Sequence, residues 1–167
     1  MDERLAVIFS RRSIRVYTDE PVSEADLQAL LEAGMAAPSA SNRKPWHLVA
    51  VTDRKTLQAL AEAHPFGKML AGAGAAIAVC GDPEISAWWV QDCSAATENI
   101  LIAAAALGLG AVWLGSHGRP DRERAIRGVL AIPDSIGVLS LLSIGHPAEE
   151  KDARTQYDPG RVHRDGW

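Results

Sequence analysis

The uncharged stretch from Asn99 to Gly118 constrains the fold of this chain more than any other feature. It is nearly long enough to cross a bilayer, since a membrane helix needs about 20 apolar residues. Gly108 and Gly110 divide the stretch, however, and a glycine in such a place typically ends a helix. We therefore expect a buried helix that turns into a buried strand, with the rest of the chain folded around both.

The alanine-rich part of this helix, "AATENILIAAAALGLG", allows two interpretations. Its small side chains would let another helix approach closely over several turns. The helix is either an ordinary core helix, or a core helix that also forms the seam of a symmetric dimer, the commonest kind of oligomer. The sequence leaves both open.

Composition indicates a globular protein of one domain. The chain has 167 residues, of which 47% are hydrophobic and 23% are charged, enough for a sizeable core. Its net charge of −4 gives no general attraction to nucleic acid or to an acidic membrane. The first residues, "MDERLAVIFSRR", carry acids before their apolar run, unlike a secretory signal. We expect a cytoplasmic protein with no nucleic-acid or membrane partner.

Helices and strands are expected to alternate along the chain. Ser23 and Asp53 are typical N-caps, and Pro120 is typical of a helix start. We expect helices that open at these three positions, a long helix over 85–107, and strands over 47–52, 75–81, 111–116 and 137–145. Taken alone, this alternation favours an α/β sheet.

No short motif carries chemistry by itself. The segment "GAGAAI" lacks the third glycine of a dinucleotide fingerprint and precedes a strand, where the fingerprint must follow one. The five histidines are never paired at ligand spacing, so we expect no metal. Cys80 and Cys93 lie in apolar surroundings and are expected to be buried, reduced thiols. No nucleophile stands beside a base, so an enzyme with this sequence would need a cofactor.

Two polar segments stand out. The first, "SRRSIRVY", places Arg11, Arg12 and Arg15 around the hydroxyl of Ser13. It is either a solvated positive patch or a phosphate site, since the planar fork of arginine suits phosphate oxygens. The second, "APSASNRKPW", presents small polar groups and two cations between two prolines, which exclude helix and hold the loop.

These segments, taken in order, resemble the nitroreductase family of flavoproteins. The resemblance also includes "QDCSAATENILIAAAALGLG", "VWLG", "LAIPDSIGVLSLLSIGHPAEE" and "ARTQYDPGRVHRDGW", and it covers essentially the whole chain. It implies an α+β fold with a largely antiparallel central sheet flanked by helices. It further implies an intertwined homodimer with FMN at two interface sites, each chain being a single domain of residues 1–167 whose arm, 146–167, packs on the partner subunit.

The resemblance assigns residues at the two chain ends to FMN. Arg11, Arg12 and Ser13 match the residues that hold the FMN phosphate and ribityl chain. Arg15 matches a cation near the pyrimidine edge of the flavin ring. Arg154 matches a basic residue near the C-terminus that returns to the same phosphate.

Two further segments are assigned in the same way. Pro38, Ser39 and Asn42 match a loop that reaches the FMN of the opposite subunit. Leu114 and Gly115 match a segment whose backbone N–H meets the flavin N5 and O4.

The chain departs from the family pattern at several positions. Lys44 stands where the family usually has glutamine, and we still assign it to flavin contact. Lys68 matches a position that contacts the ring in longer relatives. Glu98 replaces a usual glutamine before Asn99. Lid insertions of larger members are absent from the pattern, which leaves the acceptor undefined.

The implied function is an FMN-dependent oxidoreductase that takes electrons from NADH or NADPH and reduces nitroaromatics, quinones or similar small acceptors by ping-pong hydride transfer. No catalytic side chain is implied, because the flavin N5 carries the chemistry. The alternatives are a specialised relative, such as a reductive dehalogenase or a flavin-cleaving enzyme, and a non-catalytic protein that binds or senses flavin.

Overall fold

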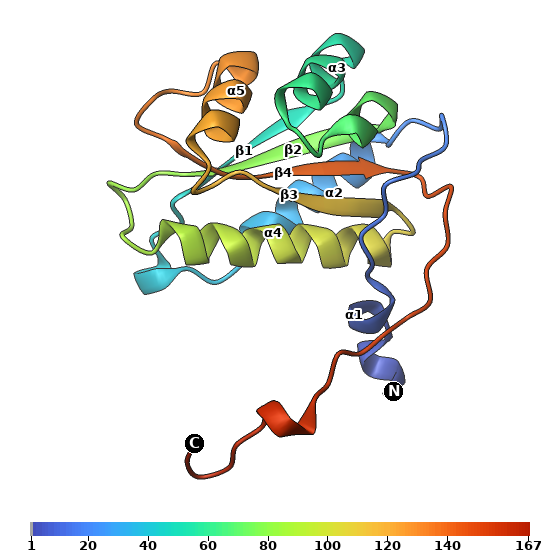
Figure 1. The fold of residues 1–167 in the computed structure, drawn as a ribbon, viewed down its shortest axis with the longest axis vertical. Helices are drawn as coiled ribbons and strands as arrows, with labels where there is room; N and C mark the ends of the chain where they lie inside the picture. Colours follow the sequence, from blue (N-terminus) through green and yellow to red (C-terminus); the bar gives the residue numbers. More distant parts are fainter. Residues whose placement is uncertain (1) are drawn as a thin grey trace.

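The computed structural model describes residues 2–167 and contains one four-stranded sheet (Figure 1). Its strands are β1 (Trp46–Val51), β2 (Ala75–Gly81), β3 (Gly110–Gly115) and β4 (Gly137–Gly145). They lie in the order β1-β2-β4-β3, and every neighbouring pair is antiparallel. The expected antiparallel α+β fold is confirmed, and the α/β sheet favoured by alternation alone is wrong.

Two of the antiparallel pairs arise because the chain leaves a strand, forms a helix and then enters the neighbouring strand at the same end of the sheet. Val51, the last residue of β1, pairs with Ala76 at the start of β2. The intervening helix α3 (Arg54–Ala63) and the 3₁₀ helix η3 (Lys68–Gly72) pack against each other. The segment that they form begins and finishes at the same end of the sheet. The helix α5 (Pro120–Leu130) makes the same kind of return between β3 and β4. A crossover connection to a parallel strand would instead have to reach the opposite end of the strands.

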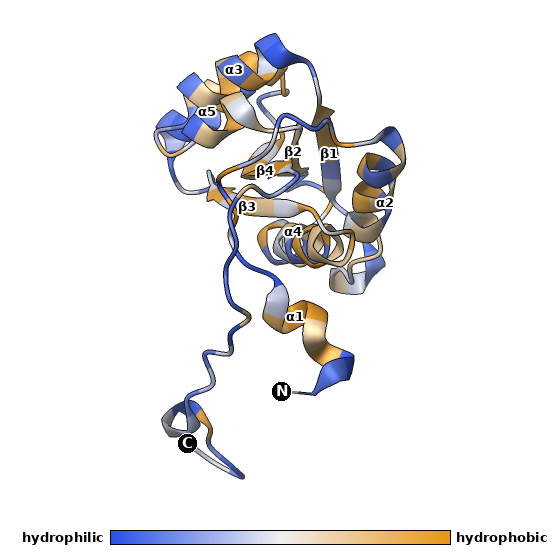
Figure 2. Cartoon of the chain, turned by 90° about the vertical axis from the view of Figure 1, so that its right-hand side faces the viewer, coloured by the Kyte–Doolittle hydropathy of each residue, from blue (hydrophilic) through white to orange (hydrophobic). Residues whose placement is uncertain are grey.

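Helices cover both faces of the sheet (Figures 1 and 2). The helices α3 and α5 lie on one face. The helix α2 (Glu24–Met35) and the long helix α4 (Trp89–Ala106) lie on the other, and α2 packs on α4. All seven residues of β2 are buried as a result. Alternate residues of β2 contribute to two separate cores: Ala75, Ile77 and Val79 pack with α2 and α4, and Ala76, Ala78 and Cys80 pack beneath α3 and α5.

The two thiols lie in this interior. Cys80 and Cys93 are fully buried and unbridged, and the Cys93 thiol donates to the carbonyl of Cys80 at 3.3 Å. Burial raises the pKa of Cys80 to about 11 and that of Cys93 to about 12. Both are therefore protonated at neutral pH, which confirms the expectation of buried, reduced thiols.

Most expected elements are present with small shifts. The strands β2 and β4 have the expected bounds, and β1 and β3 each begin one residue earlier. The helix α4 begins at Trp89 rather than at residue 85. The preceding residues form a turn instead, in which the N–H groups of Ile85 and Ser86 donate to the carbonyl of Asp82.

Both chain ends project from the compact body (Figures 1 and 2). The N-terminal helix α1 (Ala6–Ser10) has no buried residue, and Leu5 and Ile8 are 45% and 50% exposed. The final segment passes α1 and extends beyond it, with every residue from Asp152 to Trp167 exposed. In the described chain these ends offer apolar surface that the body leaves uncovered.

Candidate functional site

The arginine-rich segment lies against the outer edge of the sheet. Ser13 forms a parallel bridge with Ala111 of the edge strand β3, and the N–H of Ile14 donates to the carbonyl of Ala111 at 3.0 Å. Ile14 is buried, whereas Arg15 is exposed. The segment is therefore fixed to a rigid strand while its cation remains available.

A pair of glycines makes room for this segment. Gly110 and Gly145 face each other across β3 and β4. A Cβ added at Gly110 would lie 2.5 Å from Ile14, and one added at Gly145 would lie 2.9 Å from Tyr17. No side chain fits at such distances, so only glycine lets the N-terminal segment approach the sheet this closely.

The structure brings the two ends of the chain together beside α4. The Arg12 guanidinium donates to the carbonyl of Asp152, and the N–H of Arg154 donates to the carbonyl of Phe9 at 3.0 Å. The Nε of Arg11 lies 3.2 Å from the Oε1 of Glu98 on α4. Arg11, Arg12 and Ser13 thus lie near the backbone of Arg154.

A small cavity opens at this neighbourhood. Its volume is about 180 Å³, and Ser10, Arg12 and Ile14 line one side while Leu101 and Ala105 of α4 line the other. Pro147 and Glu149 complete the wall. The cavity therefore places one guanidinium and one carboxylate beside a largely apolar floor.

The second polar loop is anchored at the opposite end of α4 (Figure 1). The N–H of Ala40 donates to the carboxylate of Asp92, in the first turn of α4, at 2.8 Å. The N–H of Lys44 donates to the Ser39 hydroxyl at 3.0 Å. Ser41, Asn42 and Lys44 adopt left-handed backbone conformations, with φ of 51°, 56° and 51°, and Pro38, Asn42 and Lys44 are exposed. The loop is held and its polar groups face outward.

Within one chain this loop and the arginine-rich segment do not meet. Asp92 holds the loop and Glu98 contacts Arg11, and the separation of six positions along the helix corresponds to a rise of about 9 Å. Pro38, Ser39, Asn42 and Lys44 therefore lie apart from Arg11, Arg12 and Arg154 in the single chain.

The end of β3 forms a third group. Leu114 is buried and Gly115 is exposed, and a Cβ added at Gly115 would meet no atom within 4 Å. The Gly115 carbonyl accepts from the Nε2 of His64 at 3.2 Å and from the Arg122 guanidinium at 3.0 Å. This carbonyl is fixed, and the space over Gly115 is open.

His64 was not identified from the sequence. It is 2% exposed, and its Nδ1 accepts from the N–H of Phe66 at 3.2 Å. The proton must then reside on Nε2, which donates to Gly115. Burial lowers the pKa of His64, so the ring is neutral at neutral pH. Only the folding of α3 against β3 brings the two residues together, and no local pattern signals it.

Lys68 lies apart from the N-terminal arginines. It begins η3 and lines a hollow of about 360 Å³ that His64 also lines. Lys68 is exposed there. The structure thus places it on the α3 side of the sheet.

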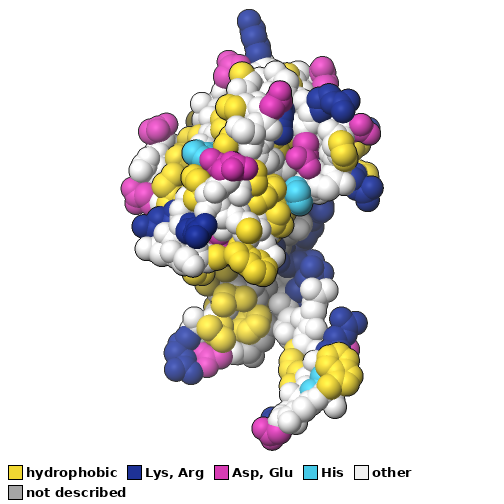
Figure 3. All heavy atoms as spheres, turned by 90° about the vertical axis from the view of Figure 1, so that its left-hand side faces the viewer, with side chains coloured by type: hydrophobic (Ala, Val, Ile, Leu, Met, Phe, Trp, Pro, Cys, Tyr) yellow, Lys and Arg dark blue, Asp and Glu magenta, His cyan; other side chains and the backbone are white. Residues whose placement is uncertain are grey.

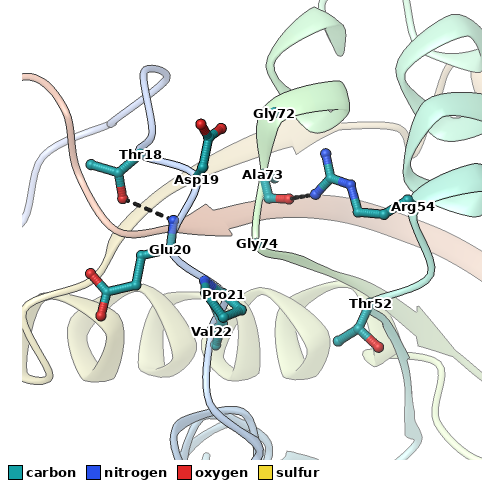
Figure 4. A pocket seen from close by; sticks show the side chains of 10 residues that line it. All are labelled: Thr18, Asp19, Glu20, Pro21, Val22, Thr52, Arg54, Gly72, Ala73 and Gly74. Atoms are coloured by element: carbon teal, nitrogen blue, oxygen red, sulfur yellow. Dashed lines mark hydrogen bonds between the residues drawn. The ribbon is translucent and has the colours of Figure 1, made fainter.

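A further hollow of about 370 Å³ lies between residues 18–22 and 72–74 (Figure 4). Arg54 lines it, but its guanidinium already donates to the carbonyls of Ala71 and Ala73. The lining contains none of the predicted site residues. We assign this hollow no role.

Across residues 2–167, no helix is both long and apolar enough to cross a membrane. The same residues contain no group of three or more histidine, cysteine, aspartate or glutamate side chains arranged to hold a metal ion.

Known proteins resemble the chain throughout its length. The sequence model of the Nitroreductase family matches residues 8–65 and 64–146. A protein of Archaeoglobus fulgidus, named as a candidate NADH dehydrogenase/NAD(P)H nitroreductase, is 51% identical over 174 residues, which cover 100% of both chains.

Solved structures share the fold. An FMN-dependent nitroreductase from Clostridium difficile superposes with a TM-score of 0.93 at 31% identity, over 98% of this chain and 99% of that one. A candidate nitroreductase from Desulfovibrio desulfuricans, solved in complex with FMN, gives a TM-score of 0.84 at 31% identity, over 100% and 99%. With the antiparallel sheet and the family match, these likenesses show that the chain belongs to the nitroreductase family of flavin-dependent oxidoreductases.

Proposed function

We propose that this chain is an FMN-dependent NAD(P)H oxidoreductase that reduces nitroaromatics, quinones or similar small acceptors. The observation that carries the proposal is the convergence of Arg11, Arg12 and Ser13 with Arg154 from the other end of the chain. Arg12 lines the cavity, and a guanidinium suits a phosphate monoester, which carries close to two negative charges near neutral pH.

The residues present fit FMN at three points. The arginine-rich segment and the cavity beside it supply donors for the phosphate. A Cβ added at Gly115 would meet no atom within 4 Å, and we propose that the flat ring lies there against the end of β3, with a backbone N–H at N5. The loop with Pro38, Ser39, Asn42 and Lys44 supplies further polar contacts.

Bound FMN would supply the redox chemistry by taking a hydride from NAD(P)H and passing it to the acceptor. The protein's own part is binding and electrostatics. Arg15, an exposed cation on a segment fixed to β3, is proposed to stabilise negative charge at the pyrimidine edge of the ring. Leu114 and Gly115 are proposed to hold the ring at N5 and O4.

A homodimer is part of the proposal. The polar loop is held at the first turn of α4, whereas Arg11 contacts Glu98 farther along the helix and the cavity is lined by Leu101 and Ala105 beyond it. We therefore propose that one chain does not present both to the same ligand. A second copy would supply the missing loop.

The chain ends support this arrangement. Apolar side chains gather on both α1 and the C-terminal segment, which hang from the body with open space between them (Figure 3). Leu5, Ile8, Tyr157, Val162 and Trp167 are exposed large apolar residues there. We propose that residues 146–167 form an arm that packs on the partner subunit, since burial of such surface is favourable.

The experiment is anaerobic mixing of the purified, FMN-loaded protein with NADH or NADPH, followed by a nitroaromatic or a quinone. We expect the yellow absorbance to bleach and then to return when the acceptor is added. Steady-state rates should give parallel double-reciprocal lines, because the two substrates would use one site in turn. Persistent colour would favour a flavin-binding protein instead, and irreversible loss of flavin would favour a flavin-cleaving enzyme.

A further inference from the structure

The carboxylate of Glu149 holds the backbone of the arginine-rich segment. Its Oε1 accepts from the N–H of Arg15 at 2.6 Å and from that of Val16 at 3.3 Å. Its Oε2 lies 3.1 Å from the Nζ of Lys151, which in turn donates to the carbonyl of Ser13 at 2.6 Å. Glu149 and Lys151 therefore bracket residues 13–16, from which they are separated by most of the chain.

The same residues are held from other directions as well. The N–H of Ile14 donates to Ala111 of β3 at 3.0 Å. The hydroxyl of Tyr17 lies 2.8 Å from the carbonyl of Ile14 and 3.0 Å from that of Ser143. Burial raises the pKa of Tyr17 to about 12, so this hydroxyl keeps its proton. The backbone of the segment is thus fixed by strand, side chain and C-terminal segment together.

The position of Glu149 is unusual for an acid. It lines the cavity that Arg12 lines, where a phosphate is proposed to bind. A free carboxylate at that place would repel an anion. Here the backbone N–H of Arg15 and the ammonium of Lys151 compensate the charge, and they hold the pKa of Glu149 below its usual value. Glu149 must therefore contribute by holding the backbone of Arg15 and Val16 in place, not by contacting an anion.

Fixing this backbone determines where the side chains point. In an extended segment successive side chains alternate between two faces. Ile14 is buried against Gly110 and lines the cavity together with Arg12. The alternation therefore directs Arg12 to the side of the cavity and Ser13 and Arg15 to the other face. A segment free to rotate would scatter the same groups and bind an anion more weakly.

We propose that Glu149, assisted by Lys151, is a positioning residue for cofactor binding: it fixes residues 13–16 so that the arginine-rich segment presents its donors to the FMN phosphate. The inference rests on the proposed phosphate role of Arg11, Arg12 and Ser13.

The test compares FMN with riboflavin, which has the same ring and lacks the phosphate. Dissociation constants of both are measured by flavin fluorescence for the wild type and for variants of the full chain. We expect Glu149→Ala to lower the preference for FMN over riboflavin on the order of tenfold, the scale of one charge-assisted hydrogen bond. Glu149→Asp keeps the charge but is one methylene too short, so it should lower the preference as well.

Glu150→Ala is the matched control. Glu150 is the exposed neighbour and makes no hydrogen bond or ion pair within residues 2–167. The control removes the same charge and should leave the preference unchanged. Should Glu149→Ala fail to fold, Glu149→Asp and Lys151→Met decide the question, since the first removes only one methylene and the second keeps the length of the side chain.

Three outcomes are distinct. An unchanged preference in the Glu149 variants overturns the inference, and so does an equal loss of affinity for FMN and riboflavin, which would indicate a merely structural residue. A wild type that does not prefer FMN to riboflavin contradicts the proposed phosphate site itself. A lost preference in the Glu149 variants with an unaffected control supports the inference.

Discussion

The ion pair between Arg11 and Glu98 gives the proposed phosphate site a competitor within the chain. Arg11 is 26% exposed and Glu98 is 47% exposed. A pair this open to water contributes little stability. Its carboxylate nevertheless occupies a guanidinium that a phosphate would use, and it adds a negative charge near an anion.

Two substitutions at this pair should therefore act in opposite directions. Arg11→Ala should weaken FMN binding by roughly 1.5–3 kcal/mol, the value of a charge-assisted hydrogen bond. Glu98→Gln should strengthen it by a few tenths to about 1 kcal/mol, because the repulsion is lost and the guanidinium is released. Fluorescence titration with FMN measures both, with Glu62→Gln on α3 as a control. Weaker binding by the Glu98 variant would contradict this account of the pair.

At the scale of elements, α3 and β3 are joined by the buried imidazole of His64. The ring is neutral because burial lowers its pKa, whereas an unfolded chain has a histidine pKa near 6.5. As the pH falls below that value, the unfolded state takes up a proton that the folded state resists. The stabilisation is therefore complete above about pH 6.5 and is lost as the pH falls towards the folded pKa.

His64→Gln should remove this dependence on pH. Between pH 7.5 and 5.5 the wild type should lose up to about 1 kcal/mol more of its free energy of unfolding than the variant loses. Urea unfolding at matched protein concentration measures the difference. A steep pH dependence that persists in the His64 variant would refute the argument.

How far the sequence predicts this molecule also depends on the element. Apolar runs bounded by glycine located β2 and β4 with their observed bounds. The direction of the strands was not predictable from the residues alone. It depends on whether the chain, after α3, re-enters the sheet at the end where it left, and hydrophobic periodicity carries no information on this. Only the resemblance to a family indicated the antiparallel sheet.

In the candidate site, too, some residues could be identified from the sequence and others could not. Arg11, Arg12 and Arg15 stand out as a dense group within an acidic chain. Glu149 and His64 do not, because each acts through backbone groups that lie more than 50 residues away, at Arg15 and Gly115. Such contacts arise only from the tertiary fold.

At the scale of the whole molecule, the C-terminal arm is the part of the chain for which a single copy provides no surface to pack on. Residues 152–167 are exposed throughout, and Trp167 stacks on His163 with ring centroids 4.3 Å apart rather than on the body. A large aromatic group in that position is expected to find its surface on a second copy.

Truncation after Arg154 tests this expectation. The shortened chain retains Asp152 and Arg154 with their contacts to Arg12 and Phe9, so the proposed phosphate site remains complete within each chain. We expect the dimer to dissociate at a concentration at least tenfold higher than the wild type does, as sedimentation velocity would measure. Trp167→Ala should give a smaller shift in the same direction. An equally tight dimer after truncation would show that the arm has another purpose.

The contact between Arg12 and Asp152 also bears on how the molecule is made. The two residues are 140 positions apart, so Arg12 leaves the ribosome long before Asp152 is synthesised. The N-terminal segment likewise cannot settle beside Gly145 until that glycine has emerged. A nascent polypeptide therefore cannot complete the proposed phosphate site before Asp152 has emerged, and we expect flavin to bind only after that point.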